Sequence, residues 1–182
     1  MTTSAIALVG NPNVGKSVLF HRLTGAYVNV SNYLGTTVEV ARATARFDAE
    51  IDLIDTPGVL TLPARSDDER ATMRALLHEP LRTVIQVGDA KNLRRTLTLT
   101  ALMAELGVPA VLALNMHDEA SGRGVTVDAQ ALSPPLTSLM RTIIIRIVVS
   151  SLSPCCLDGL RHLASHGLRK PSMRPQPALF DI

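Results

Sequence analysis

This sequence has few cysteines and a small net charge, and each of these features excludes some classes of site or partner. The 182 residues include only two cysteines, Cys155 and Cys156. Because they are adjacent, the sequence predicts neither a disulfide framework nor a zinc site, which suits the reducing cytoplasm. The formal net charge of +2 is too small to indicate nucleic acid or an anionic membrane as a partner.

Long apolar runs are also missing. No run reaches about 18 residues, so we expect no transmembrane segment in this chain. The N-terminal MTTSAIALVG has neither the basic region nor the full apolar region of a signal peptide. We therefore expect a cytoplasmic protein.

Short apolar runs alternate with helical patterns through the first two thirds of the chain. The predicted strands span 5–9, 51–54, 83–87 and 110–114, and the predicted helices span 16–25, 68–78 and 95–107. This alternation predicts crossover connections and a mostly parallel sheet. The more polar segment 38–47 is expected to be an edge strand that forms a hairpin with 50–55. The expected fold class is α/β, with three α/β/α layers and one antiparallel edge strand.

From about residue 133 the sequence changes character. Proline pairs and serine clusters flank the apolar run IIIRIVV, and basic side chains outnumber acidic ones. The end, LRKPSMRPQPALF, holds three prolines. We expect one domain over 1–165, divergent from about 133, and a disordered tail over 166–182.

The segment GNPNVGKS, from Gly10 to Ser17, fits the phosphate-binding pattern G-x-x-x-x-G-K-[ST]. It lies between a predicted strand and a predicted helix, as this motif requires. The backbone N–H groups of such a loop and the N-terminus of the next helix surround phosphate. Lys16 is expected to contact the β- and γ-phosphates and Ser17 to bind Mg²⁺. The motif alone leaves ATP and GTP both open.

The segment IDLIDTPG, residues 51–58, ends a predicted strand at Asp55. There the carboxylate is expected to support Mg²⁺, directly or through a water, and the Gly58 N–H to approach the γ-phosphate. The alternative is an ordinary turn, since D-T-P-G is good turn chemistry. Between the two motifs, a threonine could close over the nucleotide, and spacing does not choose between Thr36 and Thr37.

The segment ALNMHD provides Asn115 and Asp118 after another predicted strand. Guanine presents two donors, N1–H and N2–H₂, which one carboxylate can accept, whereas adenine has no such edge. A site of this kind rejects the wrong base because its polar groups stay unpaired. Asn115 is expected to tie this loop to the phosphate loop. We interpret His117 as a solvated spacer.

Together, GNPNVGKS, DTPG and NMHD resemble the small GTPases of the translation-factor-related class. The segments NVSNYLGTTVE, VGDAKNLRRTLTLTALMAELG and LALNMHDEA are similar to the cytosolic G domain of ferrous iron transport protein B, over about residues 4–130. The resemblance implies a P-loop GTPase that uses GTP/GDP, Mg²⁺ and K⁺. It also implies regulation of ferrous iron uptake at the inner face of the cell membrane, with a permease region that this chain lacks as its partner.

The resemblance also assigns residues. It selects Thr37 as the switch I ligand of Mg²⁺, beside Ser17 and Asp55, and Asn13 as a ligand of K⁺. Val59 replaces the water-positioning glutamine of Ras-type enzymes, which implies slow turnover raised by K⁺ or a partner. Catalysis is assigned to Lys16, Thr37 and Gly58. The nucleotide-binding set is Gly10, Asn11, Pro12, Asn13, Val14, Gly15, Lys16, Ser17, Val18, Gly35, Thr36, Thr37, Asp55, Thr56, Pro57, Gly58, Asn115, Met116, Asp118, Ser150 and Ser151.

The sequence departs from the family in two places. Leu34 stands where a proline usually precedes the switch I glycine. The last base-binding loop is not clear, and VVSSLS, with Ser150 and Ser151, is its best candidate. The family's helical and permease domains are absent, so we expect a fragment or a gene product whose C-terminal part diverged.

Two other functions remain open from the sequence. One is a guanine-nucleotide binding module with little turnover. The other is a ribosome- or RNA-associated GTPase of the same class, although the C-terminal part is short, broken by prolines and poor in aromatic residues. Direct iron binding has weaker support, because His162 and His166 have no carboxylate at matching spacing.

Overall fold

The computed structural model describes residues 4–24, 29–32, 38–59, 64, 66–105, 107, 110–128 and 131–132. The predictions for Gly35, Thr36, Thr37, Ser150 and Ser151 and for the disordered tail lie outside these residues. In the described part of the chain, no helix is both long and apolar enough to cross a membrane.

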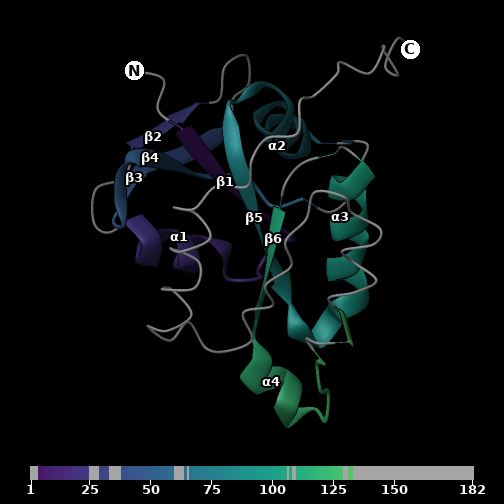
Figure 1. The fold of residues 1–182 in the computed structure, drawn as a ribbon. Coiled ribbons are helices and arrows are strands. Elements are labelled where there is room, and N and C mark those ends of the chain that lie inside the picture. The colour runs from purple at the N-terminus through teal and green to yellow at the C-terminus, as the bar shows by residue number, and fades with distance from the viewer. Residues whose placement is uncertain are drawn as a thin grey trace.

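Strands and helices alternate along the chain (Figure 1). The strands are β1 Ser4–Gly10, β2 Asn29–Asn32, β3 Glu39–Ala45, β4 Asp48–Asp55, β5 Leu81–Asp89 and β6 Ala110–Asn115. The helices are α1 Lys16–Thr24, α2 Asp67–His78, the 3₁₀ turn η1 Ala90–Asn92, α3 Leu93–Glu105 and α4 His117–Gly122. Each strand and helix predicted from the sequence is present, with ends shifted by a few residues at most.

The six strands form one sheet in the order β2-β3-β4-β1-β5-β6. The four strands from β4 to β6 in this order pair in parallel, while β3 runs antiparallel to both of its neighbours. The α/β prediction and the β3–β4 hairpin are therefore confirmed. The edge position of β3 was wrong, because β2 lies outside it. β2 has no apolar pattern to reveal it, since Val30 is 59% exposed and backbone pairing with β3 holds the strand.

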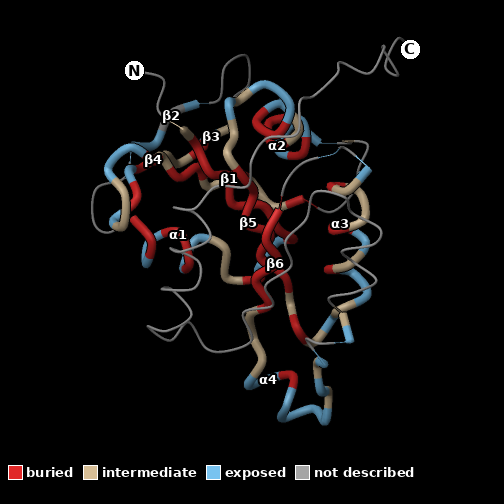
Figure 2. The backbone as a smooth tube through the Cα atoms, viewed as in Figure 1, coloured by how far each residue is buried: buried red, intermediate tan, exposed pale blue. Residues whose placement is uncertain are grey.

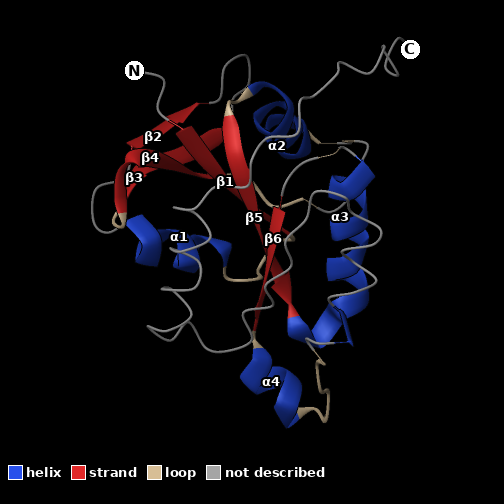
Figure 3. Cartoon of the chain, in the orientation of Figure 1, coloured by secondary structure: helices blue, strands red, loops and turns tan. Residues whose placement is uncertain are grey.

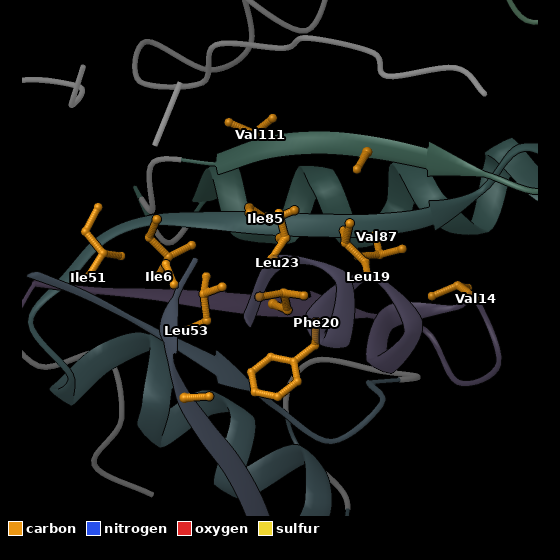
Figure 4. Packing of buried hydrophobic residues seen from close by; sticks show 14 residues of the cluster. Ile6, Val14, Leu19, Phe20, Leu23, Ile51, Leu53, Ile85, Val87 and Val111 are labelled. Carbon is orange, nitrogen blue, oxygen red and sulfur yellow. The ribbon is translucent and has the colours of Figure 1, made fainter. Parts of the chain in front are cut away.

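Helices cover both faces of the sheet, α1 on one face and α2 and α3 on the other (Figure 3). The central strands are buried on both sides (Figure 2), which explains their continuous apolar runs. Phe20, Leu19 and Leu23 of α1 pack on Ile6 and Leu53 of the sheet (Figure 4). On the opposite face the core includes Leu76 of α2 and Leu99 and Met103 of α3. These two cores fix the strand ends, from which the functional loops leave.

Candidate nucleotide-binding site

The polar motifs meet at one edge of the sheet. In the strand register, Leu8 of β1 lies beside Asp55 at the end of β4, and Asp89 at the end of β5 lies beside Asn115 at the end of β6. Parallel sheets bind ligands at the carboxyl ends of their strands, and this is that edge. An open cleft of about 720 Å³ lies here, lined by Lys16, Ser17, Val38, Glu39, Ala41, Asp55, Thr56, Pro57, Gly58, Asp67 and Asp68.

The loop between β1 and α1 has the backbone of a phosphate-binding loop. Asn13 and Gly15 have φ values of 63° and 83°, which turn successive N–H groups and create a concave surface for an anion. Gly10 must lack a side chain, because a Cβ there would collide with the Val87 carbonyl of β5. The loop therefore depends on the two glycines that the motif specifies.

At Gly15, a Cβ would collide with the Nδ2 atom of Asn115. We expect Gly15→Ala to lower the free energy of unfolding by about 1–2 kcal/mol, because φ is positive. It should also weaken GDP binding about tenfold, because the collision displaces Asn115. Thermal melting and a fluorescent-GDP titration measure the two effects.

Gly107→Ala is the matched control, since Gly107 has a φ of 66° and nothing within 4 Å of a Cβ. This control should lose stability alone. Equal GDP binding by the two variants would show that the contact with Asn115 is unimportant.

The structure brings Lys16, which the sequence predicted at the phosphates, together with Ser17 and Asp55, which it predicted at Mg²⁺. The Lys16 ammonium pairs with one oxygen of the Asp55 carboxylate, and both side chains are 11% exposed. The Ser17 hydroxyl donates to the other oxygen at 2.7 Å. Hydroxyl and carboxylate oxygens are hard ligands of the kind that Mg²⁺ prefers, so these residues fit that ion. The lysine supplies positive charge beside them.

The DTPG segment and Val59, which follows it, are tied to β1 and to the phosphate loop by hydrogen bonds. Asn11 Nδ2 donates to the Val59 carbonyl at 2.8 Å, and the Val59 N–H donates to the Gly10 carbonyl at 2.9 Å. The Thr56 hydroxyl donates to the Leu8 carbonyl at 2.8 Å. The side chains of Asn11 and Thr56, which we expected in the binding set, are thus used within the fold.

On the base side, Asn115 Nδ2 donates to the Val14 carbonyl at 3.0 Å. This bond joins the two loops as predicted. Asp118 is exposed in the first turn of α4, after Met116 in a left-handed conformation with φ 61°. Between them, Nδ1 of His117 is buried without a hydrogen-bond partner in the described structure. The interpretation of His117 as a solvated spacer was wrong for this atom, because a four-residue motif has no periodicity from which burial can be read.

The remaining predicted residues occupy different positions. Pro12, Asn13 and Val18 are exposed, whereas the Val14 side chain is buried in the α1 core. Pro57 and Gly58 line the cleft. Asp67 and Asp68, which were not predicted as site residues, also line the cleft at the start of α2. The sequence does hold a signal for this helix start, since Ser66 and Glu69 form a capping box around Asp67 and Asp68.

Comparisons with known proteins agree on one family. The family model described as ferrous iron transport protein B matches residues 4–150. An Fe(2+) transport protein A/Fe(2+) transporter FeoB fusion protein of Porphyromonas gingivalis is 44% identical over 134 residues, which are 72% of this chain and 16% of that protein. The Fe(2+) transporter FeoB of Salmonella typhimurium is 41% identical over 141 residues, 75% of this chain and 18% of that protein. The chain therefore spans less than a fifth of these relatives.

Solved structures give the same result. An NFeoB variant of S. thermophilus bound to mGDP aligns with a TM-score of 0.77 and 30% identity, over 91% of this chain and 61% of that one. NFeoB of S. thermophilus bound to GDP·AlF4⁻ and K⁺ aligns with a TM-score of 0.71 and 30% identity, over 90% and 62%. The cytosolic domain of the T. maritima FeoB iron transporter in a GMPPNP form reaches 0.78 and 30%, over 95% and 67%.

Proposed function

This chain belongs to the ferrous iron transport protein B family, and from that premise we propose that it is a guanine-nucleotide switch that hydrolyses GTP to GDP and phosphate. The single observation that carries the proposal is the hydrogen bond from Asn115 to the Val14 carbonyl, since it joins the base loop to the phosphate loop. Lys16, Ser17 and Asp55 gather at the same edge. The RNA-associated alternative is not favoured, because the matched relatives are Fe(2+) transporters.

The phosphate chemistry follows from the side chains at the cleft. Lys16 contacts the β- and γ-phosphates and offsets their charge, and the Gly58 N–H donates to the γ-phosphate. Ser17 and Asp55 would hold Mg²⁺, with Thr37 as a further ligand. When bound, Mg²⁺ supplies positive charge to the phosphate oxygens. A water oxygen bonds to the γ-phosphorus, the bond to the β–γ bridging oxygen breaks, and GDP leaves, while the two protons of the water stay on the released phosphate.

Turnover is slow in this proposal because no glutamine follows Gly58 to position the water. Val59 follows Gly58 where a glutamine would be needed, and its side chain is buried in the core. Asn13 lies exposed in the phosphate loop. The carbonyl oxygen of its side-chain amide is a suitable ligand for K⁺ beside the phosphates. The K⁺ complex of the S. thermophilus relative supports this role.

The biological role proposed is regulation of ferrous iron transport from the cytosolic face of the membrane. The full-length relatives are Fe(2+) transporters, and this chain aligns with less than a fifth of their length. The partner would be the permease region of such a transporter. That region would respond to the nucleotide-dependent conformation of the segments around Thr37 and Gly58.

Single-turnover GTP hydrolysis in KCl and in NaCl tests the enzymatic proposal. We expect GDP and GTP to bind and ATP not to bind, and hydrolysis to be faster in KCl. The KCl effect should disappear in Asn13→Ala, because the ligand of K⁺ is lost. Tight nucleotide binding without turnover in either salt would instead indicate a binding module. Absence of guanine-nucleotide binding would refute the proposal.

A further inference from the structure

The short helix α4 carries Asp118 and, within the part of the chain that the structure describes, has few features of its own that could hold it in place. It has six residues, and its N-cap, Met116, makes no side-chain capping bond. Only Ala120 among its described residues is buried. A helix this short is not stable in isolation, so its orientation depends on tertiary contacts.

One such contact is the ion pair between Lys91 and Glu119. Lys91 lies in η1, directly after β5, and its Nζ atom is 2.6 Å from Oε2 of Glu119. The Lys91 side chain is 15% exposed and the Glu119 side chain is 51% exposed, so water screens this pair in part. Glu119 is the residue next to Asp118, and η1 contacts α4. The pair therefore acts on the turn that carries the guanine-reading carboxylate.

Lys91 is itself held by a chain of hydrogen bonds that begins in the core. Its N–H donates to Oδ1 of Asp89 at 2.8 Å, and the Asp89 N–H donates to the Thr96 hydroxyl at 3.0 Å. Thr96 is buried, and its carbonyl accepts from the buried side chain of Gln86 at 2.8 Å. These bonds hold the backbone of Lys91 against the core, and the ammonium group of the same residue pairs with α4.

We infer that Lys91 is a positioning residue for guanine recognition. Its ion pair with Glu119 fixes the first turn of α4, so that Asp118 meets both donors of the base at once. The pair also neutralises Glu119, which leaves Asp118 as the acceptor at this turn. The inference rests on the proposed function, since it concerns the same base site. It adds a residue that positions Asp118 for guanine.

Competition of GDP and IDP against a fluorescent guanine nucleotide tests the inference, because inosine lacks the exocyclic N2 amine. In Lys91→Met we expect GDP affinity to fall about fivefold, the upper end for a partly exposed ion pair. IDP affinity should fall less, so the ratio of GDP to IDP affinity should also fall. Lys91→Arg, and the exchange of Lys91→Glu with Glu119→Lys, should both restore the ratio.

Glu79→Gln is the matched control, because it breaks the Arg42–Glu79 ion pair at 2.9 Å between β3 and the end of α2. This variant should keep the wild-type ratio. An unchanged ratio in Lys91→Met, or a ratio that the charge exchange fails to restore, would overturn the inference while leaving the proposed function intact. Failure of the wild-type chain to bind GDP would overturn both.

Discussion

Replacing Asp118 with asparagine is expected to change the base preference of this chain from guanine to xanthine. In the proposed function the carboxylate accepts from N1–H and N2–H₂ of guanine, whereas an amide would place its N–H₂ group against the N2–H₂ group of the base. Xanthine has a carbonyl at C2, so the same amide can accept from N1–H and donate to that oxygen. GDP affinity should fall about a hundredfold or more, because a charge-assisted contact is lost and two donors oppose each other.

Isothermal titration with GDP and XDP measures this change. Glu50→Gln is a suitable control, since Glu50 is exposed in β4 and far along that strand from its carboxyl end. The control should bind GDP as the wild type does. If Asp118→Asn retained GDP affinity and did not gain XDP affinity, Asp118 would not be the acceptor for the base.

Removal of the Lys16 ammonium should lower the affinity for every nucleotide by a similar factor, whichever base the nucleotide carries. Lys16→Met keeps most of the apolar stem but loses the positive charge, so the phosphates lose a charge-assisted contact. We expect affinity for both GDP and GTP to fall about a hundredfold or more. Unlike Asp118→Asn, this variant should gain no affinity for XDP, because the base site is unchanged.

Fluorescent-nucleotide titration and thermal melting should be measured together for Lys16→Met. The substitution also leaves Asp55 without its ion pair, although Ser17 still donates to the carboxylate. Arg42→Met is the matched control, since it removes a different ion pair from the sheet. A Lys16→Met chain that melts like the wild type and still binds GDP tightly would contradict the assignment of Lys16 to the phosphates.

Much of the fold could be predicted because its signals are local. The apolar runs of β1, β5 and β6 are continuous since both faces of these strands are buried. β2 escaped prediction because four mostly polar residues are held by backbone bonds to β3 and by no apolar face. The antiparallel strand was identified, but its place in the sheet depended on this missed neighbour.

The candidate site divides in the same way. The phosphate-loop motif specified Gly15 and Lys16 by spacing, and Asn115 was correctly expected to join the two loops. The internal use of Asn11 and Thr56 was not visible, since nothing in a motif distinguishes a side chain that binds a ligand from one that bonds to a neighbouring strand. Residues on loops predicted by resemblance, such as Thr37, stay predictions.

The sequence by itself determined the class of fold, the phosphate loop and the residue types available for a nucleotide and Mg²⁺. Only the tertiary structure decided which distant residues meet. Lys16 and Asp55 are 39 positions apart, and Lys91 and Glu119 are 28 apart. Spacing and periodicity report backbone conformation and burial over a few turns, whereas pairs at this separation form only when the order of strands brings their ends to one edge of the sheet.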